Sequence, residues 1–346
     1  MKRNRSRWMD RRAPRAVSRG LSRAWTGALP ALLLSLSSLA GCVGEERDDC
    51  PPPGPGFNIA LEFSLPGEDG VDRFLDEIHS VDVFILDSAG GFSRRERVER
   101  AALEAYQGLR LRLDPGRYRV TCWGNNAANT AYEGLATGAT TGGIAYASVV
   151  AGATGDGDPL YRAPRPATTR ATRAAARAGD GHAVDGLLAL DVPATGDGVT
   201  LPVEFSAAHH VVEVRVVGFN GGNSLPGVEI AGLPAGDELL SGLSLLDASL
   251  ATRRVTGRKE AVDDGSNSHA SVATFTTFRF ALDDPAVIIR VLDGAGNEAC
   301  PPVVLADAID PAAPSTAITI YITINFINAT VEVTVEGWES NEVQRP

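Results

Sequence analysis

The chain has 346 residues, of which 44% are hydrophobic, 22% are charged and only 6% are aromatic. This composition excludes a disordered chain, and the length suits two domains of ordinary size. The net charge of −11 divides unevenly, because residues 1–41 carry +8 and residues 42–346 therefore carry −19. A body this acidic repels phosphate backbones, which excludes nucleic acid as a partner.

Residues 1–41 have the pattern of a signal peptide. Nine Lys and Arg residues precede an apolar run from Ala28 to Ala40. At about 1.5 Å per residue, this run is too short to cross a hydrocarbon core of about 30 Å as a permanent helix. A basic head followed by a short apolar run is typical of a secretory signal that is later removed. Translation can start at Met1 or at Met9, and the sequence leaves both open.

The apolar run ends in Leu39-Ala40-Gly41-Cys42, which resembles a bacterial lipobox. The resemblance implies that Cys42 becomes the lipidated first residue of the mature chain, carrying palmitate or similar acyl chains. One acyl chain anchors a protein only marginally, so stable anchoring takes more than one. We therefore expect a lipid-anchored protein of the cell outer membrane, exposed at the surface. Residues 42–56 follow as a Pro-rich tether, which the prolines keep extended.

Three cysteines remain once Cys42 carries lipid. Cys50, Cys122 and Cys300 allow at most one intramolecular disulfide, and the sequence leaves the pairing open. Cys122 stands next to Trp123 in an apolar stretch, which favours a small buried side chain. Their spacing does not fit a zinc site.

Alternation of apolar and polar residues predicts strands in residues 57–163. Ile59, Leu61 and Phe63 alternate with polar or small residues, and Val81–Leu86 is a uniformly apolar run suited to a strand covered on both faces. Residues 109–113 and 118–122 flank the turn residues Asp114-Pro115-Gly116, which predicts a hairpin. Residues 71–80 and 94–106 are the expected short helices.

Residues 187–346 repeat the alternation. Strands are expected at Leu201–Phe205 and Val212–Val216, and residues 318–335 predict a long terminal hairpin with a turn at Asn328-Ala329-Thr330. Between the two halves, residues 164–186 form a low-complexity linker or loop with little to pack. Many strands with so little helix indicate an all-β protein of antiparallel β-sandwich domains.

The sequence carries no recognisable catalytic or cofactor motif, so we expect a protein that is not an enzyme and has no catalytic, cofactor-binding or metal-binding residue. His209 and His210 are adjacent at a strand start, so their side chains point to opposite faces. The oxygen-rich stretches 156–158 and 263–267 do not match an EF-hand calcium loop, and turns are the favoured interpretation.

Eight segments occur in an order that resembles one family. They are Asp48-Asp49-Cys50-Pro51, Val81–Asp87, Ala89–Phe92, Leu113–Tyr118, Trp123–Asn125, Pro159–Tyr161, His209–Val211 and Val335–Trp338. Together with the lipobox they resemble the FimB-like fimbrial anchor lipoproteins of Bacteroidales, the minor-fimbria anchors included. The resemblance implies two transthyretin-like antiparallel β-sandwich domains in tandem.

The same resemblance implies a function at the base of a fimbrium. Such proteins anchor the fimbrium, limit its length, and bind the major fimbrial subunit and accessory fimbrial proteins by strand addition. Residues 339–346 are short and polar, so we expect this chain to accept a strand rather than donate its tail. Two alternatives remain: an accessory or tip subunit of the fimbrium, or a surface glycan-binding β-sandwich lipoprotein.

Overall fold

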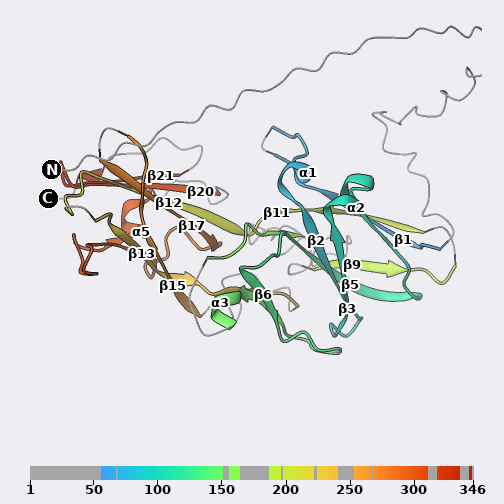
Figure 1. The fold of residues 1–346 in the computed structure, drawn as a ribbon. Coiled ribbons are helices and arrows are strands. Elements are labelled where there is room, and N and C mark those ends of the chain that lie inside the picture. The colour runs from blue at the N-terminus through green and yellow to red at the C-terminus, as the bar shows by residue number, and fades with distance from the viewer. Residues whose placement is uncertain are drawn as a thin grey trace, which may run out of the picture. The chain divides into compact units, whose positions relative to one another are not determined.

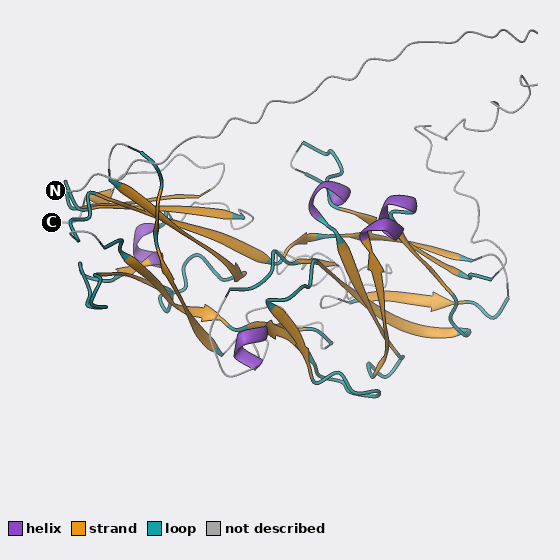
Figure 2. Ribbon diagram, viewed as in Figure 1, coloured by secondary structure: helices purple, strands orange, loops and turns teal. Residues whose placement is uncertain are grey.

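The computed structural model describes residues 56–67, 69–150, 156–163, 187–195, 198–221, 224–240, 253–266, 269–310, 318–335 and 343–344. Strands dominate these residues, and the helices are short (Figure 1, Figure 2). No helix in the described ranges is long and apolar enough to cross a membrane. The predicted signal peptide 1–41, the tether from Cys42 to residue 55 and the linker 164–186 lie outside the described residues.

The first sandwich pairs a three-stranded sheet with a six-stranded sheet. The three-stranded sheet has the order β10-β1-β4, formed by Val199–Glu204, Ile59–Ser64 and Gly108–Leu111. The six-stranded sheet has the order β11-β8-β5-β2-β3, formed by Ser206–Ala207, Tyr161–Ala163, Gly116–Gly124, Ser80–Leu86 and Phe92–Glu99, and β9 (Leu188–Val192) also pairs with β5. β1 and β10 are parallel, and the other pairs are antiparallel.

The core of this sandwich follows from the alternation along its strands. Ile59, Leu61 and Phe63 of β1 are all buried. The ring of Phe63 packs against Phe205 and against Phe74 of helix α1 (Phe74–Glu77), with ring centroids 5.6 Å apart in each pair. All seven residues of β2 are buried, as the uniformly apolar run predicted. One face of β2 contributes to this core, and Phe84 and Leu86 on its other face belong to the second core.

The expected hairpin around Asp114-Pro115-Gly116 is wrong. β4 pairs with β1 in one sheet, whereas β5 pairs with β2 in the other. The turn therefore carries the chain from one sheet to the other, and Leu111 and Val120 reach the same core from opposite sides. Alternation shows which face of a strand is buried, but it does not show which strand lies beside it.

The prediction of a helix over residues 94–106 is wrong for residues 94–99 and correct for residues 100–105. Residues 94–99 belong to strand β3, and only Arg100–Ala105 forms a helix, α2. The strand is fixed by a contact distant in sequence: Arg95 and Arg97 make ion pairs of 2.8 and 3.0 Å with the buried carboxylate of Asp82 in β2. Because a buried carboxylate needs partners, this contact overrides the local helical pattern.

The second sandwich also has two sheets. One has the order β16-β17-β12-β20-β21-β22, formed by Val262–Asp263, Ala270–Phe278, His209–Val217, Thr319–Asn325, Thr330–Val335 and Val343–Gln344. The other has the order β15-β13-β18-β19, formed by Arg254–Glu260, Gly227–Pro234, Ile288–Leu292 and Val303–Val304, with helix α5 (Leu305–Ala308) after β19. The predicted terminal hairpin is confirmed as β20 and β21, and β20 lies parallel to β12 on its other side.

A small third sheet joins the two halves of the chain. Its order is β14-β7-β6, formed by Gly236–Glu238, Gly143–Tyr146 and Thr130–Glu133, and helix α3 (Ala147–Val150) follows β7. The hydroxyl of Tyr146 accepts a hydrogen bond of 2.8 Å from the backbone amide of Phe278. Trp123 is fully buried in the same cluster.

Residues 188–207 lie in the first sandwich, although the sequence assigned residues from 187 onward to the C-terminal domain. β9, β10 and β11 pair with β5, β1 and β8, respectively. Val203 and Phe205 are buried in the first core, so these strands complete a sandwich that residues 57–163 leave unfinished. Contacts group residues 51–346 into one unit, and the other domain boundaries stay a prediction.

A buried ion pair connects the halves. Arg162 in β8 and Asp237 in β14 are 3% and 0% exposed, and Arg162 Nη1 lies 2.9 Å from Asp237 Oδ2. Burial raises the pKa of Asp237 to about 6, although the positive charge of Arg162 works in the opposite direction. Taking both charges out of water costs free energy, so each charge is tolerated only because the other is present.

Replacing one member of this pair should destabilise the protein more than replacing both. Asp237→Ala leaves Arg162 charged and buried, which we expect to cost about 3–5 kcal/mol of unfolding free energy. The double variant Arg162→Met/Asp237→Leu should regain most of that loss, as measured by urea unfolding at pH 7. Asp69→Ala, which breaks the exposed Arg73–Asp69 pair, is the matched control and should barely move the midpoint. A double variant as unstable as Asp237→Ala would contradict this account.

Candidate functional site

The cysteines that the structure describes are free thiols. Cys122 is fully buried in β5, as the sequence predicted, and burial raises the pKa of its thiol. Cys300 is half-buried and also free. Cys42 and Cys50 lie outside the described residues, so the lipidation of Cys42 and any pairing of Cys50 stay predictions.

His209 and His210 start β12 and contact different groups. His209 Nδ1 lies 2.8 Å from the carbonyl oxygen of Leu160. The ring of His210 lies nearly perpendicular to the ring of Phe280, with centroids 4.6 Å apart, and neither of its nitrogens has a hydrogen-bond partner. Burial lowers the pKa of both imidazoles, most strongly for His210. These histidines are neutral packing residues, and they do not form a shared ligand site.

The acidic clusters organise loops. Asp158 is buried and accepts hydrogen bonds from the backbone amides of Ala127 and Asn129 and from the hydroxyl of Thr130. Asp263 and Asp264 each accept a bond from the amide two residues later, which closes a turn. Within the described ranges, no group of three or more His, Cys, Asp or Glu side chains is placed to hold a metal ion.

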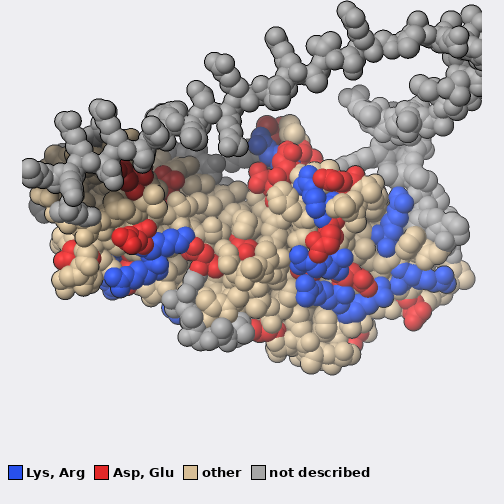
Figure 3. All heavy atoms as spheres, viewed as in Figure 1, with Lys and Arg blue, Asp and Glu red and all other residues tan. Residues whose placement is uncertain are grey.

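Sheet edges are therefore the surfaces through which a partner strand could bind. An edge strand exposes a row of unpaired backbone donors and acceptors that another strand can bind, and proteins usually protect it with charges, proline or short length. β3 carries Arg94, Arg95 and Arg97, and Figure 3 shows charged side chains crowded over this strand. β10 contains Pro202, and β15 carries several charges. β14, β16 and β19 have three residues or fewer.

The sheet of the second sandwich ends at β21 and β22, where these protections are few. β21 has no proline and a single charged residue, Glu332, and it lies between β20 and the two-residue edge strand β22. β9 also has one charge, but it is shorter, its Asp191 is ion-paired with Arg117, and Pro193 follows it. The end of the sheet at β21 and β22 is thus nearly free of charge and proline.

One side of β21 is fully paired and the other is paired over two residues. Its ladder with β20 runs from Thr330 to Val335. On the opposite side, β22 from the chain's own tail pairs with Thr330 and Val331. Val335 is buried and Val331 packs against the core. A strand added beside β21 would extend a sheet that already covers the core.

The sequence did not reveal this pairing of the tail. Residues 339–346 alternate too little to predict a strand, and Val343 is the one β-branched residue among them. Two paired residues are too few to produce a period-2 signal. The strand β21 itself was predictable, because Thr330–Val335 combines β-branched residues with one charged residue.

Comparisons with known proteins agree with this architecture. The model of a family described as fimbrillin-A associated anchor proteins Mfa1 and Mfa2 matches residues 47–343. The structure resembles a candidate polysaccharide-binding protein from Bacteroides thetaiotaomicron, with a TM-score of 0.61 and 14% identity over 83% of this chain and 98% of that one. It also resembles the fimbrial anchor protein Mfa2 from Porphyromonas gingivalis, with a TM-score of 0.56 and 15% identity over 82% and 99%. No curated protein sequence matches the chain.

The buried histidines make stability depend on pH. The unfolded chain binds a proton at His210 near pH 6.5, whereas the folded chain resists it. Stability should therefore be complete above pH 6.5 and fall below it, by up to about 1.4 kcal/mol per pH unit for one such histidine. His210→Leu should flatten the dependence of unfolding free energy on pH between 6.5 and 5. His269→Asn, at an exposed position, is the control. An unchanged slope in His210→Leu would refute this assignment.

Proposed function

Because the chain belongs to the fimbrillin-A associated anchor proteins, we propose that it is a non-enzymatic lipoprotein of the outer membrane that anchors a fimbrium and limits its length. Its partners are the major fimbrial subunit and accessory fimbrial proteins. The observation that carries the proposal is the combination of a lipobox at Cys42 with a sheet that ends in the nearly uncharged strand β21 and the two-residue strand β22. Lipid on Cys42 would attach the chain to the membrane, and β21 would bind a neighbouring subunit.

The attachment of the tether suits an anchor under tension. Residues 42–55 can span at most about 50 Å when extended. The chain then enters β1, the central strand of its sheet, which pairs with β10 along six positions and with β4 along four. A pull on the tether therefore loads hydrogen bonds on both sides of the same strand, and they resist together.

Strand acceptance is assigned to β21. An incoming antiparallel strand would pair with β21 and displace β22, which holds it over two residues. Such a strand needs alternating apolar side chains, because one of its faces would continue over the core beside Val335. The tail of this chain pairs with its own sheet over two residues and carries no such alternation. A subunit that accepts a strand in this way would hold its neighbour through main-chain hydrogen bonds.

A glycan-binding function is less well supported. Sugar-binding surfaces on β-sandwiches use exposed aromatic rings gathered on one face. Among the large apolar side chains that are exposed in the described residues, only Phe57 and Tyr321 are aromatic. Phe57 precedes β1 and Tyr321 lies in β20, which belong to different sheets.

Cells that carry Cys42→Ala should shed their fimbriae, because the chain then has no thiol to carry lipid. Electron microscopy of the cells, with immunoblots of the medium, measures the attached and the shed fractions. Cys300→Ala, which removes a half-buried free thiol, is the matched control and should leave fimbriae on the cells. Fimbriae that stay attached in Cys42→Ala would contradict the anchoring proposal and favour an accessory or tip subunit.

A further inference from the structure

The chain enters the first sandwich beside a connection that carries arginine. Asn58, which precedes β1, exchanges two hydrogen bonds with the backbone of Leu113. Its side-chain amide donates to the Leu113 carbonyl oxygen at 2.7 Å, and its Oδ1 accepts from the Leu113 amide at 3.0 Å. Residues 112–115 connect β4 to β5. We call the start of β1, this connection and the start of β5 the tether end, because the chain arrives there from Cys42.

The two ends of β1 carry opposite charge. At the tether end, residues 108–119 contain four arginines and one aspartate, a net charge of +3. Asp87, which follows β2 at the same end, accepts bonds from two backbone amides of its own loop. At the other end, where β1 leads to α1, residues 66–77 contain five Asp and Glu residues and one arginine, a net charge of −4. Figure 3 shows acidic side chains gathered around α1 and basic ones along other parts of the first sandwich.

Three arginines of the tether end are available to a partner. Among the described residues, Arg110, Arg112 and Arg119 are exposed and form no ion pair with a carboxylate. Arg117 lies 3.5 Å from Asp191, but the two side chains are 84% and 79% exposed, so water weakens this pair. The second sandwich differs, because most of its arginines bind a carboxylate within 3.0 Å: Arg215, Arg253, Arg254 and Arg290.

An exposed aromatic ring lies beside these arginines. Phe57 is 48% exposed and is next to Asn58 in the chain, and Asn58 is bound to Leu113, so the ring belongs to the tether end. Guanidinium groups bind phosphate with two parallel hydrogen bonds, and an apolar ring can enter the boundary between lipid headgroups and acyl chains. Arginines around an exposed ring are therefore suited to a lipid surface that carries phosphate.

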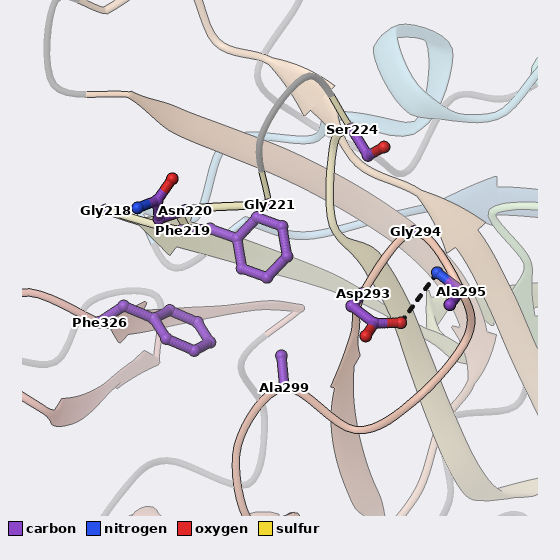
Figure 4. A pocket seen from close by; sticks show the side chains of 10 residues that line it. All are labelled: Gly218, Phe219, Asn220, Gly221, Ser224, Asp293, Gly294, Ala295, Ala299 and Phe326. Carbon is purple, nitrogen blue, oxygen red and sulfur yellow. Dashed lines mark hydrogen bonds between the residues drawn. The ribbon is translucent and has the colours of Figure 1, made fainter.

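The far end of the second sandwich has a different chemistry. A pocket of about 840 Å³ lies where β12 stops and the β20–β21 hairpin turns, with the rings of Phe219 and Phe326 on two sides of it (Figure 4). Among the described residues that line this pocket, Asp293 is the one charged side chain. β10 runs parallel to β1 away from the tether end, and β12 follows β10 after the short β11. A chain that rests on its tether end would thus hold the second sandwich away from the membrane.

We propose that the tether end docks on a phosphate-bearing lipid surface, where Arg110, Arg112 and Arg119 bind headgroup phosphates and the ring of Phe57 enters between the headgroups. The inference rests on the proposed function, because it takes lipid on Cys42 as the link that brings the chain to the membrane. A basic surface adds to the hold of an acyl chain. It also orients the body, which a tether of at most about 50 Å alone would leave free to turn.

Site-specific photo-crosslinking in fimbriated cells tests the docking. The full chain would carry the photoreactive residue p-benzoylphenylalanine at position 57 or at position 71, and the membrane fraction would be analysed by mass spectrometry. Position 57 should give light-dependent adducts with lipid. Position 71 replaces Val71, which is 57% exposed at the acidic end of β1, and should give none. A chain in the membrane fraction that gives no adduct at 57, or an adduct with protein, would overturn the docking alone. A chain absent from that fraction would overturn the proposed function with it.

Removal of one charge separates docking from simple nearness to the tether. Arg112→Gln should lower the yield of lipid adducts at position 57 by about fivefold, because each arginine near an anionic surface strengthens binding by about that factor. Arg258→Gln makes the same change at an exposed residue of β15 in the second sandwich and should leave the yield unchanged. Equal yields in the two variants, with both chains present in the membrane fraction in normal amounts, would count against the proposal.

Discussion

An unpaired strand edge is the constraint around which this molecule is organised. Every open sheet ends in edge strands whose backbone amides and carbonyls have no hydrogen-bond partner on one side. An all-β chain with several open sheets has many such edge strands. Most edges here carry a device that discourages pairing: arginines on β3, proline in β10, charges on β15. Against that background the sequence of β21 stands apart, because it has no proline and one charged residue, and the strand beside it, β22, is two residues long.

The same logic explains how polar groups are used inside the fold. The carboxylate of Asp82 is buried and is matched by Arg95, Arg97 and the hydroxyl of Tyr132. Arg162 and Asp237 form a second buried pair between the halves. Guanidinium groups suit these places, since they stay charged and donate to several acceptors at once. The titratable groups that looked like candidate ligands in the sequence pack in the fold or close turns: His209 contacts the carbonyl oxygen of Leu160, and Asp263 and Asp264 each accept a bond from the amide two residues later.

Much of the fold could be predicted from the sequence, because period-2 alternation identifies a strand and its buried face. The β20–β21 hairpin, the doubly covered β2 and the buried Cys122 all follow from that pattern. Partnership between strands could not be predicted in the same way. Asp114-Pro115-Gly116 is equally compatible with a hairpin and with a crossing between sheets, and β3 depends on a distant carboxylate.

The candidate site shows the same division. The low charge of β21 is visible in its residue types, whereas its place beside the edge strand β22 depends on the order of strands in the sheet. The pocket lined by residues 219, 299 and 326 assembles side chains that only the folded sheets bring together. Likewise, β9, β10 and β11 complete the first sandwich although a low-complexity segment precedes them, because composition marks a linker but not the side on which its neighbours pack.

Amide hydrogen exchange tests the central claim, that β21 is the edge that receives a strand. Exchange would be followed in the full chain alone and after addition of purified fimbriae. The account predicts that the amides of residues 332–335 exchange more slowly in the complex, while those of the arginine-bearing edge β3 keep their rates. Slower exchange confined to β9 or β10 of the first sandwich, with none at β21, would contradict it.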